Sequence, residues 1–407
     1  MIGWSGTRKT LTILAFILPT LLGLLMFNIY PMIYNVYISV TNRGIFHPNP
    51  NCDDALNPIL EPSCWKFLGR TPSEGLAEPF RILQPFYDNY SRLLGKLFSR
   101  DALGALLLIL IWLAPLGVAW WLDRRQGSQI TRAVPSSVLW LAGLAVFVGL
   151  FNPLKIGAAV NQLVSTGPFI AVMFRTVLYV IACIPLFFAV GFLLALVLNN
   201  PYLPGKGFFR VLLILPWGVS TSSAIAALVW QFFFREQGTI NQILQAIFTN
   251  FKPFAFLNDS AWAFIAVVIV NLWMSYPFFM VVILGALQSI PREQYEAADV
   301  DGASWWDKLT NITLPLVRPA VMPAIVLSSI TTFQMFNTVF LITAGGPLVG
   351  ADKPGATEFV MVYAYKQVYQ TQAYGKMGAF AVIIFILLFI ATLYSLRVTR
   401  ITKGAYE

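Results

Sequence analysis

Long apolar runs, separated by shorter polar segments, recur along nearly the whole chain. A helix needs about 20 such residues to cross the hydrocarbon core of a bilayer. Eight runs come close to this length or exceed it: 11–33, 101–122, 136–153, 172–199, 211–234, 260–288, 317–343 and 377–396. We expect helices throughout, because lipid offers no partner to unpaired backbone groups. The pattern therefore predicts an all-α polytopic membrane protein with about eight transmembrane helices.

The composition supports a membrane protein and argues against a nucleic-acid partner. Of the 407 residues, 57% are hydrophobic and only 11% are charged, against roughly 25% charged in soluble domains. The formal net charge of +9 comes from basic residues scattered through loops, with no dense patch to follow a phosphate backbone. The first apolar run lacks a small-residue cleavage site, so we expect an anchor span and not a cleaved signal peptide.

Lys and Arg in the short loops predict the orientation, because they concentrate on the cytoplasmic side. If both termini are cytoplasmic, the following residues share that side: Arg8, Lys9, Arg124, Arg125, Arg132, Lys206, Arg210, Arg292, Lys308, Arg397, Arg400 and Lys403. The short loops opposite are poorer, with Lys155, Arg235 and Lys252 as examples. The long 34–100 loop has more, but long translocated segments escape this rule. We therefore expect N- and C-termini in the cytoplasm.

The long outer loop contains two cysteines, Cys52 and Cys64. Outside the membrane such a pair favours a disulfide that pins the loop. Two free thiols are the alternative, and Cys183 lies apart from both in the fourth predicted span.

Ionisable residues are missing from the middles of all eight predicted spans, and Arg175 lies only at the outer end of the fourth. Their absence argues against a proton-coupled carrier, a rotary pump or a voltage-gated channel. No G-x-x-x-x-G-K-[ST] motif is present to hold ATP phosphates. The lone His47 lies in an outer loop and forms no metal-ligand pattern with the cysteines. We expect no catalytic residue, metal site or cofactor in this chain.

Neutral polar residues gather in three late spans. They are Thr221, Ser222 and Ser223 in the fifth, Asn271, Ser275 and Tyr276 in the sixth, and Thr331, Thr332, Gln334, Asn337 and Thr338 in the seventh. Hydrogen bonding between helices explains many such residues one at a time. As a cluster they favour a pathway for a neutral, hydroxyl-rich solute. The hydroxyl groups of such a solute are costly to bury without partners, and side-chain amides can hydrogen-bond them.

The segment 290–316, between the sixth and seventh spans, is too polar to cross a membrane. Its first part has good helix formers, Gly302 suits a tight reversal, and Ser304 is placed to cap a second short helix with Asp307 three residues on. We expect Trp305 and Trp306 to pack on the chain's own helices, while Tyr295 and Glu296 face a partner.

This segment resembles a known family motif. Glu296-Ala297-Ala298, Gly302 and Ile312-Thr313-Leu314-Pro315 match E-A-A-x3-G-x9-I-x-L-P at every fixed position, the EAA loop of ABC importer permeases. In that family the loop is the coupling helix that docks on a separate ATPase subunit, which binds the ATP and Mg. The resemblance implies ATPase-coupling roles for Tyr295, Glu296, Ala297, Ala298 and Gly302.

The wider sequence is similar to the larger permease subunit of maltose-type sugar importers, over roughly residues 11–41 and 165–400. Shared marks include Asn89-Tyr90, Ile214-Leu215-Pro216-Trp217, Gly238-Thr239-Ile240-Asn241 and Thr343-Ala344-Gly345-Gly346-Pro347. This implies a type I ABC importer permease fold in a prokaryotic inner membrane. The expected segments are 1–33, 34–100, 101–156, a permease core at 165–400 and a tail at 401–407. The very large outer domain of some maltose-type members is missing.

The resemblance also implies where sugar would bind, about half-way through the subunit. The residues so implied are Trp217, Thr221, Asn271, Trp273, Met274, Ser275, Gln334 and Asn337.

The implied working complex contains this chain, a second permease subunit, two ATPase subunits and an extracytoplasmic solute-binding protein. The chain itself would be a transport subunit and not an enzyme. Glycerol-3-phosphate or another polyol derivative is an alternative substrate, although a phosphate calls for Arg or Lys in the pathway. A membrane scaffold or receptor component that docks a cytoplasmic partner is the alternative from a different class.

Overall fold

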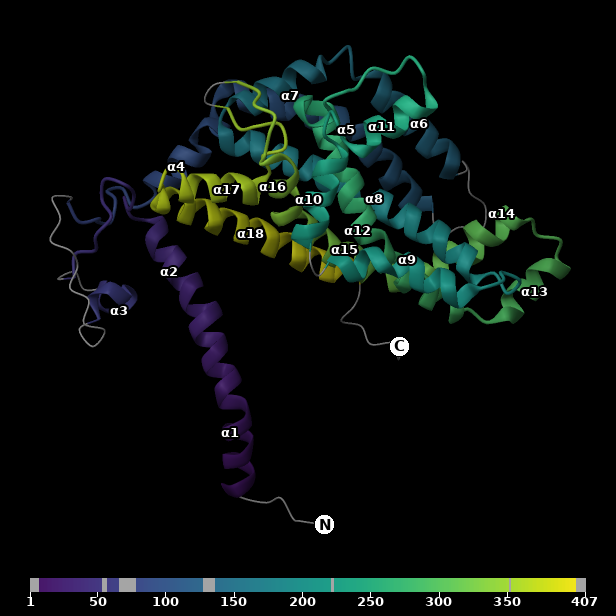
Figure 1. Cartoon of the computed structure of the whole chain (residues 1–407), viewed down its shortest axis with the longest axis horizontal. Helices are drawn as coiled ribbons and strands as arrows, with labels where there is room; N and C mark the ends of the chain where they lie inside the picture. Colours follow the sequence, from purple (N-terminus) through teal and green to yellow (C-terminus); the bar gives the residue numbers. More distant parts are fainter. Residues whose placement is uncertain are drawn as a thin grey trace. The chain divides into compact units, whose positions relative to one another are not determined.

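A computed structural model describes residues 7–52, 57–65, 78–126, 136–220, 223–350 and 353–399, and their regular structure is helical (Figure 1). The chain divides into two compact units. Residues 1–95 and 364–389 form the first, and residues 96–363 and 390–407 form the second.

Six helices among the described residues are long and apolar enough to cross a membrane. They are Leu11–Ser39, Arg100–Asp123, Pro168–Asn199, Ser260–Gln288, Trp305–Phe333 and Tyr374–Ser395. Among the described residues, shorter helices cover the other two predicted spans. At 136–153 the structure has α6 (Ser136–Gly149), whose 14 residues extend about 21 Å. At 211–234 it has α9 (Lys206–Ser220) and α10 (Ser223–Phe233).

The seventh predicted span, 317–343, is divided. Helix α15 (Leu314–Phe333) ends at Phe333, and α16 (Asn337–Thr343) begins four residues later. The segment from Gln334 to Phe336 is not helical. Hydropathy predicts an apolar run here correctly, but not the interruption of its backbone.

The first unit is built on one continuous helical stretch, α1 (Thr7–Leu24), the π-helical turn η1 (Leu25–Ile29) and α2 (Tyr30–Ser39). It also contains α3 (Asn57–Leu60), η2 (Pro62–Cys64), α4 (Asp88–Leu94), and most of α17 (Val360–Tyr369) and α18 (Tyr374–Thr399). The end of α2 is held by Asn89, whose side-chain amide donates to the carbonyls of Ser39 and Thr41, each at 2.9 Å. Gly375 lies so close to the Thr41 carbonyl that a Cβ would collide with it.

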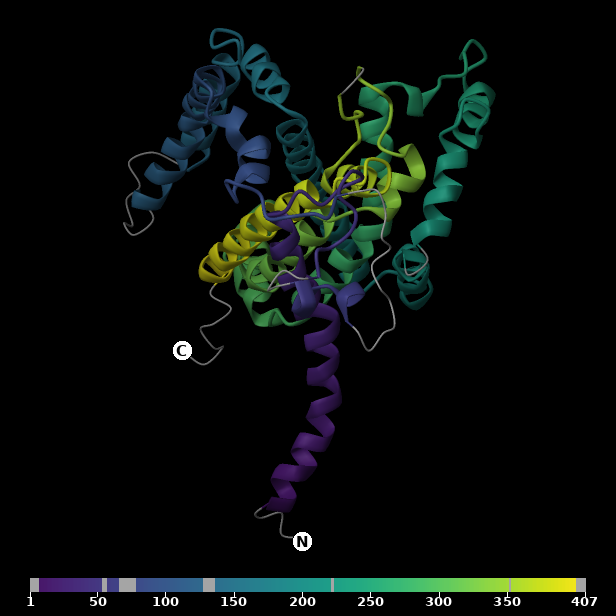
Figure 2. The ribbon, with the colours of Figure 1, turned by 90° about the vertical axis from the view of Figure 1, so that its left-hand side faces the viewer.

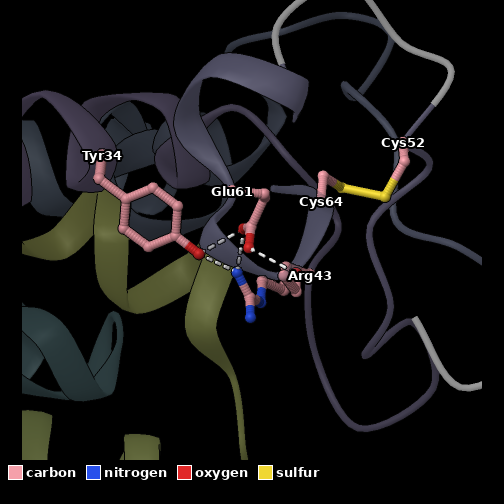
Figure 3. The surroundings of a disulfide bond; sticks show 6 residues. Tyr34, Arg43, Cys52, Glu61 and Cys64 are labelled. Atoms are coloured by element: carbon pink, nitrogen blue, oxygen red, sulfur yellow. Dashed lines mark hydrogen bonds and ion pairs between the residues drawn. A yellow bond between two sulfur atoms is a disulfide. The ribbon is translucent and has the colours of Figure 1, made fainter. Parts of the chain in front are cut away.

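A disulfide joins Cys52 to Cys64 in the segment between α2 and α4 of this unit (Figure 3). Beside it the Glu61 carboxylate is buried, with 3% of the residue exposed. Its partners are the Arg43 guanidinium, at 2.5 Å, and the Tyr34 hydroxyl, which accepts a hydrogen bond from Arg43 and donates one to Glu61. The loop therefore has a covalent link and a buried ion pair side by side.

The second unit has its core between α8 (Pro168–Asn199) and α12 (Ser260–Gln288). Gly191 brings these helices together, because a Cβ there would lie 2.7 Å from the Cβ of Phe279 and 2.9 Å from the nitrogen of Met280. Tyr179, Phe187, Phe279 and Met280 are completely buried in this core.

Two further groups of helices flank that pair. Helix α5 (Arg100–Gln126) packs on α6 and on α7 (Ile156–Ser165); the Trp112 indole donates to the Phe147 carbonyl at 2.7 Å. Helix α10 packs on α16, and the Gln231 amide donates to the Ile342 carbonyl at 3.3 Å. In the view of Figure 2, α5 and α6 (blue) and α10 (teal) stand on opposite sides of the second unit.

The connection after α10 is fastened by two residues of the Gly238-Thr239-Ile240-Asn241 run. A Cβ at Gly238 would collide with the carbonyls of Phe232 and Phe233. Asn241, 1% exposed, donates to the Arg235 and Phe254 carbonyls at 3.1 and 2.9 Å and accepts from the Phe254 amide at 2.9 Å. These contacts orient α11 (Thr239–Ile247) and the chain that leads through η5 (Phe256–Asn258) into α12.

Candidate functional site

The segment between α12 and α15 forms two short helices, as its sequence predicts. Helix α13 covers Arg292–Val300 and α14 covers Trp305–Lys308; the π-helical turn η6 (Leu309–Thr313) then leads into α15. Gly302 joins them with φ at +74°, a left-handed conformation, and no atom lies within 4 Å of a Cβ placed there. Ser304 and Asp307 form the expected reciprocal cap, with side-chain to backbone distances of 3.2 and 3.0 Å. The Lys308 ammonium contacts the Asp299 carboxylate at 2.5 Å and ties the helices together.

The faces of these helices differ from the expectation. Tyr295 is half-buried, and its hydroxyl hydrogen-bonds the Thr313 hydroxyl at 2.9 Å. Trp305 and Trp306 are each 63% exposed, with ring centroids 5.7 Å apart. The prediction that the two tryptophans pack on the chain's own helices was wrong; that Tyr295 faces a partner stays a prediction. Both tryptophans lie in the first turn of α14, and burial begins one turn later, at Leu309.

The remaining coupling candidates lie on the surface or near it. Glu296 and Ala297 are exposed, Ala298 is half-buried, and Gly302 is exposed. A carboxylate, a small side chain and a glycine turn are therefore presented together at one end of the second unit. Such a surface admits close approach by another protein's backbone while keeping a charged anchor.

Two of the predicted sugar-binding residues are buried within the unit. Asn271 is completely buried; its side-chain amide donates to the Cys183 sulfur at 3.8 Å, and its carbonyl oxygen accepts from the Ser275 hydroxyl at 3.3 Å. Met274 is 4% exposed, and its sulfur accepts from the Thr338 hydroxyl at 3.8 Å. In this conformation they hold α12 against α8 and α16, the role of interhelical hydrogen bonds.

Three others are exposed: Trp217 on α9, Gln334 at the end of α15 and Asn337 at the start of α16. Trp273 and Ser275 are half-buried, and Trp273 meets Trp230 edge to face at 5.7 Å. Thr221 lies outside the described residues. Gln334 and Asn337 flank the interruption between α15 and α16, where a polar side chain on a membrane helix needs a polar cavity or a partner.

One linkage of the second unit was not anticipated from the sequence. The Arg175 guanidinium, near the start of α8, donates through Nη1 to the carbonyls of Pro354 and Gly355 at 2.9 and 2.5 Å. The only signal was a lone cation at a span end, and nothing local named its distant acceptors.

Comparison with known proteins places this architecture in a family. Residues 156–404 match the family model described as "Binding-protein-dependent transport system inner membrane component". Because this match covers more than half of the chain, the protein belongs to that family of membrane transport components. It is therefore a multi-pass inner-membrane transport subunit and not an enzyme.

Individual relatives carry sugar-transport names. The chain is 33% identical over 236 residues to the galactooligosaccharides transport system permease protein GanP of Bacillus subtilis, covering 58% of this chain and 56% of the relative. It is 34% identical over 243 residues to the maltose/maltodextrin permease protein MalF of Vibrio vulnificus, covering 58% and 46%. Against the trehalose/maltose permease protein MalF of Thermococcus litoralis it is 33% identical over 258 residues, covering 63% and 81%. The chain thus spans about half the length of the first two.

A solved structure has the same fold. The match is to a chain of a bacterial alginate ABC transporter in complex with an alginate pentasaccharide-bound periplasmic protein. Its TM-score is 0.50 at 21% identity, covering 77% of this chain and 98% of that chain. The predicted all-α fold of an ABC importer permease is confirmed at this level, with six spans in the described residues.

Proposed function

We propose that the chain is the permease subunit of an ATP-driven, binding-protein-dependent carbohydrate importer and forms half of its translocation pathway. The observation that carries this proposal is the α13–Gly302–α14 turn. It combines the full EAA pattern with an exposed Glu296 and a left-handed glycine. The sugar names of the relatives support the substrate class.

In this proposal the turn docks on an ATPase subunit that binds ATP and Mg, and a second permease completes the pathway. An extracytoplasmic binding protein delivers the solute. Closure of the ATPase pair pulls on α13 and α14, and the Tyr295–Thr313 hydrogen bond and the turn η6 carry the displacement into α15. This is a rigid-body route to alternating access.

The proposed topology keeps both termini cytoplasmic and counts eight crossings. Helix α6 and the α9–α10 pair supply the other two crossings. A shorter crossing is tolerable where neighbouring helices cover its ends or the bilayer thins around it. The pair α5 and α6 has such mutual cover, as the Trp112–Phe147 contact illustrates.

The proposed solute site lies at the α15–α16 interruption. Gln334 and Asn337 are exposed there, and interrupted membrane helices commonly bind solutes near the bilayer midplane. Trp217 offers an exposed ring as a face for a sugar. Asn271 and Met274 then support the site from within α12, since their polar atoms already have partners in the chain.

The coupling role is tested by Glu296→Ala in the reconstituted complex, with Glu293→Ala as the matched control. Both carboxylates are exposed on α13, but only Glu296 belongs to the EAA pattern. We expect Glu296→Ala to lose most of the ATPase stimulation by saccharide-loaded binding protein, while Glu293→Ala retains it. Unchanged stimulation in Glu296→Ala would reject coupling through this turn and favour a scaffold.

A further inference from the structure

A cavity of about 790 Å³ opens in the second unit, between the end of α7, the start of α8 and the loop after α16. The predicted orientation places it on the outer side of the membrane. Its polar lining consists of Asn161, Gln162, Ser165, Thr166, Arg175 and Lys353. The volume falls within the roughly 300–1,000 Å³ typical of ligand sites and is far larger than a single inorganic ion needs.

One wall of this cavity is held rigidly. The Arg175 bonds to Pro354 and Gly355 fasten the loop to α8, and a Cβ at Gly355 would collide with the Gly345 carbonyl. The Glu358 carboxylate accepts from the Gly355 amide at 3.1 Å, and the Thr357 hydroxyl donates to the Gly346 carbonyl at 2.6 Å. The site is therefore built before any ligand arrives, which lowers the entropic cost of binding.

The two cations that line the cavity, Arg175 and Lys353, have hydrogen-bond donors available to a ligand. Both Arg175 bonds to the loop use Nη1, and in the described part of the chain Nη2 and Nε have no acceptor. The exposed Lys353 ammonium has no ion pair among the described residues. Among the described residues that line the cavity there is no carboxylate; the Glu358 carboxylate attracts Arg175 from outside the lining. The first turn of α8 lacks a capping side chain, so its positive end adds to the same field.

This charge is unusual for its place. Short outer loops of membrane proteins are depleted of Lys and Arg, so two cations that line one outer cavity favour a ligand that carries an anion. A guanidinium and an ammonium suit a carboxylate. The amides of Asn161 and Gln162 and the hydroxyls of Ser165 and Thr166 suit neutral hydroxyl groups of the same ligand.

We propose that this cavity is an outer binding site for a carboxylate-bearing saccharide, such as an oligosaccharide of uronic acids. The inference rests on the proposed carbohydrate function and narrows its substrate class. Arg175 and Lys353 bind the carboxylate, and the neutral side chains bind ring hydroxyls. The acidic solute is retained at the mouth of the pathway, while the spans beyond, which lack cations in their middles, do not trap its charge.

The test measures binding of trigalacturonate to the full-length chain in zwitterionic lipid nanodiscs, by titration calorimetry. Maltotriose is the neutral comparison and acetate the minimal carboxylate. We expect trigalacturonate to bind more tightly than either. Lys353→Gln should weaken it about fivefold, as loss of an exposed charge contact does, and Arg175→Gln about 10- to 100-fold.

Three further variants separate the effect of charge from that of the loop's attachment. Lys252→Gln removes an exposed outer cation that does not line the cavity and should leave affinity unchanged. Arg175→Gln removes the charge and also releases the loop that Arg175 holds. Arg175→Lys keeps the charge, so the Arg175→Lys variant should retain part of the affinity for trigalacturonate. Lys353→Glu, which reverses an exposed charge, should weaken trigalacturonate binding more than Lys353→Gln and spare maltotriose.

Equal binding of trigalacturonate and maltotriose, or trigalacturonate binding that is indifferent to Lys353→Gln and Arg175→Gln, would overturn the proposal. So would acetate binding as tightly as trigalacturonate, because the site would then recognise a simple anion. No detectable saccharide binding overturns it as well. The proposed importer function is tested separately by the ATPase assay of Glu296→Ala, because that substitution does not alter this cavity.

Discussion

Gly302 offers a substitution whose cost follows from the backbone alone. With φ at +74°, alanine at this position must adopt the left-handed conformation, at about 1–2 kcal/mol. No atom lies within 4 Å of the new Cβ, so no steric clash within the chain adds to this strain. A cost of this size lowers the population of the observed turn by a factor of about 5–30.

Loss of the turn at Gly302 would separate α13 from α14. The Asp299–Lys308 ion pair at 2.5 Å depends on α13 and α14 folding back on each other, and Glu296 is presented by α13. In Gly302→Ala we therefore expect saccharide-stimulated ATPase activity of the reconstituted complex to fall about 5- to 30-fold. Gly302→Asn should retain much more activity, because Asn tolerates the left-handed region better than Ala does.

The comparison of the two variants is decisive. Size-exclusion chromatography of the assembled complex checks that each variant still inserts and folds. If Ala and Asn impair coupling equally, or if Asn is worse, the glycine is needed for space against the partner and not for its φ. That result would refute the strain argument.

Three further predictions concern stability, each measured as the midpoint of thermal unfolding in detergent. Gly191→Ala should destabilise the α8–α12 pair by about 1–3 kcal/mol through overpacking, while Gly285→Ala, with no atom within 4 Å of its Cβ, should be neutral. Asn241→Ala should lower the free energy of unfolding by about 1–3 kcal/mol for each buried partner left unpaired. If the variant is as stable as the wild type, water has replaced the amide and the reasoning is wrong. Arg43→Met should cost up to about 3 kcal/mol by leaving Glu61 buried without its cation, and Arg43→Met with Glu61→Gln should recover part of that loss.

Local signals in the sequence were sufficient to predict the turn between α13 and α14. A glycine at a reversal, a serine three residues before an aspartate and good helix formers on either side each act within a few residues. The structure has the turn at Gly302 and the cap at Ser304. Which side chains face inward is instead decided by contacts with the turn η6, as the Tyr295–Thr313 bond illustrates, and local signals do not contain those contacts.

Hydropathy located the apolar runs but not the continuity of their helices. It sums side-chain transfer energies over a window, whereas an interruption such as Gln334–Phe336 depends on backbone hydrogen bonds lost and replaced. It also does not distinguish the faces of α12, which is apolar nearly all round. Residue type and the family resemblance predict that Asn271 lines the pathway, whereas in this structure its amide is fully buried against Cys183.

The outer cavity was not predicted because its two cations come from distant parts of the chain. Arg175 and Lys353 are each unremarkable in their own segments. Only the packing of the loop after α16 on the start of α8 brings them to one cavity. Sites assembled across such distances require a tertiary structure.

The link between Cys52 and Cys64 has a consequence for biogenesis. A helix such as Leu11–Ser39 is apolar enough to insert during synthesis, whereas a disulfide forms only after its cysteines reach an oxidising compartment. The chain would thus mature in two stages, first insertion and then oxidation of the outer loop around Glu61. A host that lacks thiol oxidation on the outer side should yield a permease that is embedded in the membrane but unfinished on its outer surface.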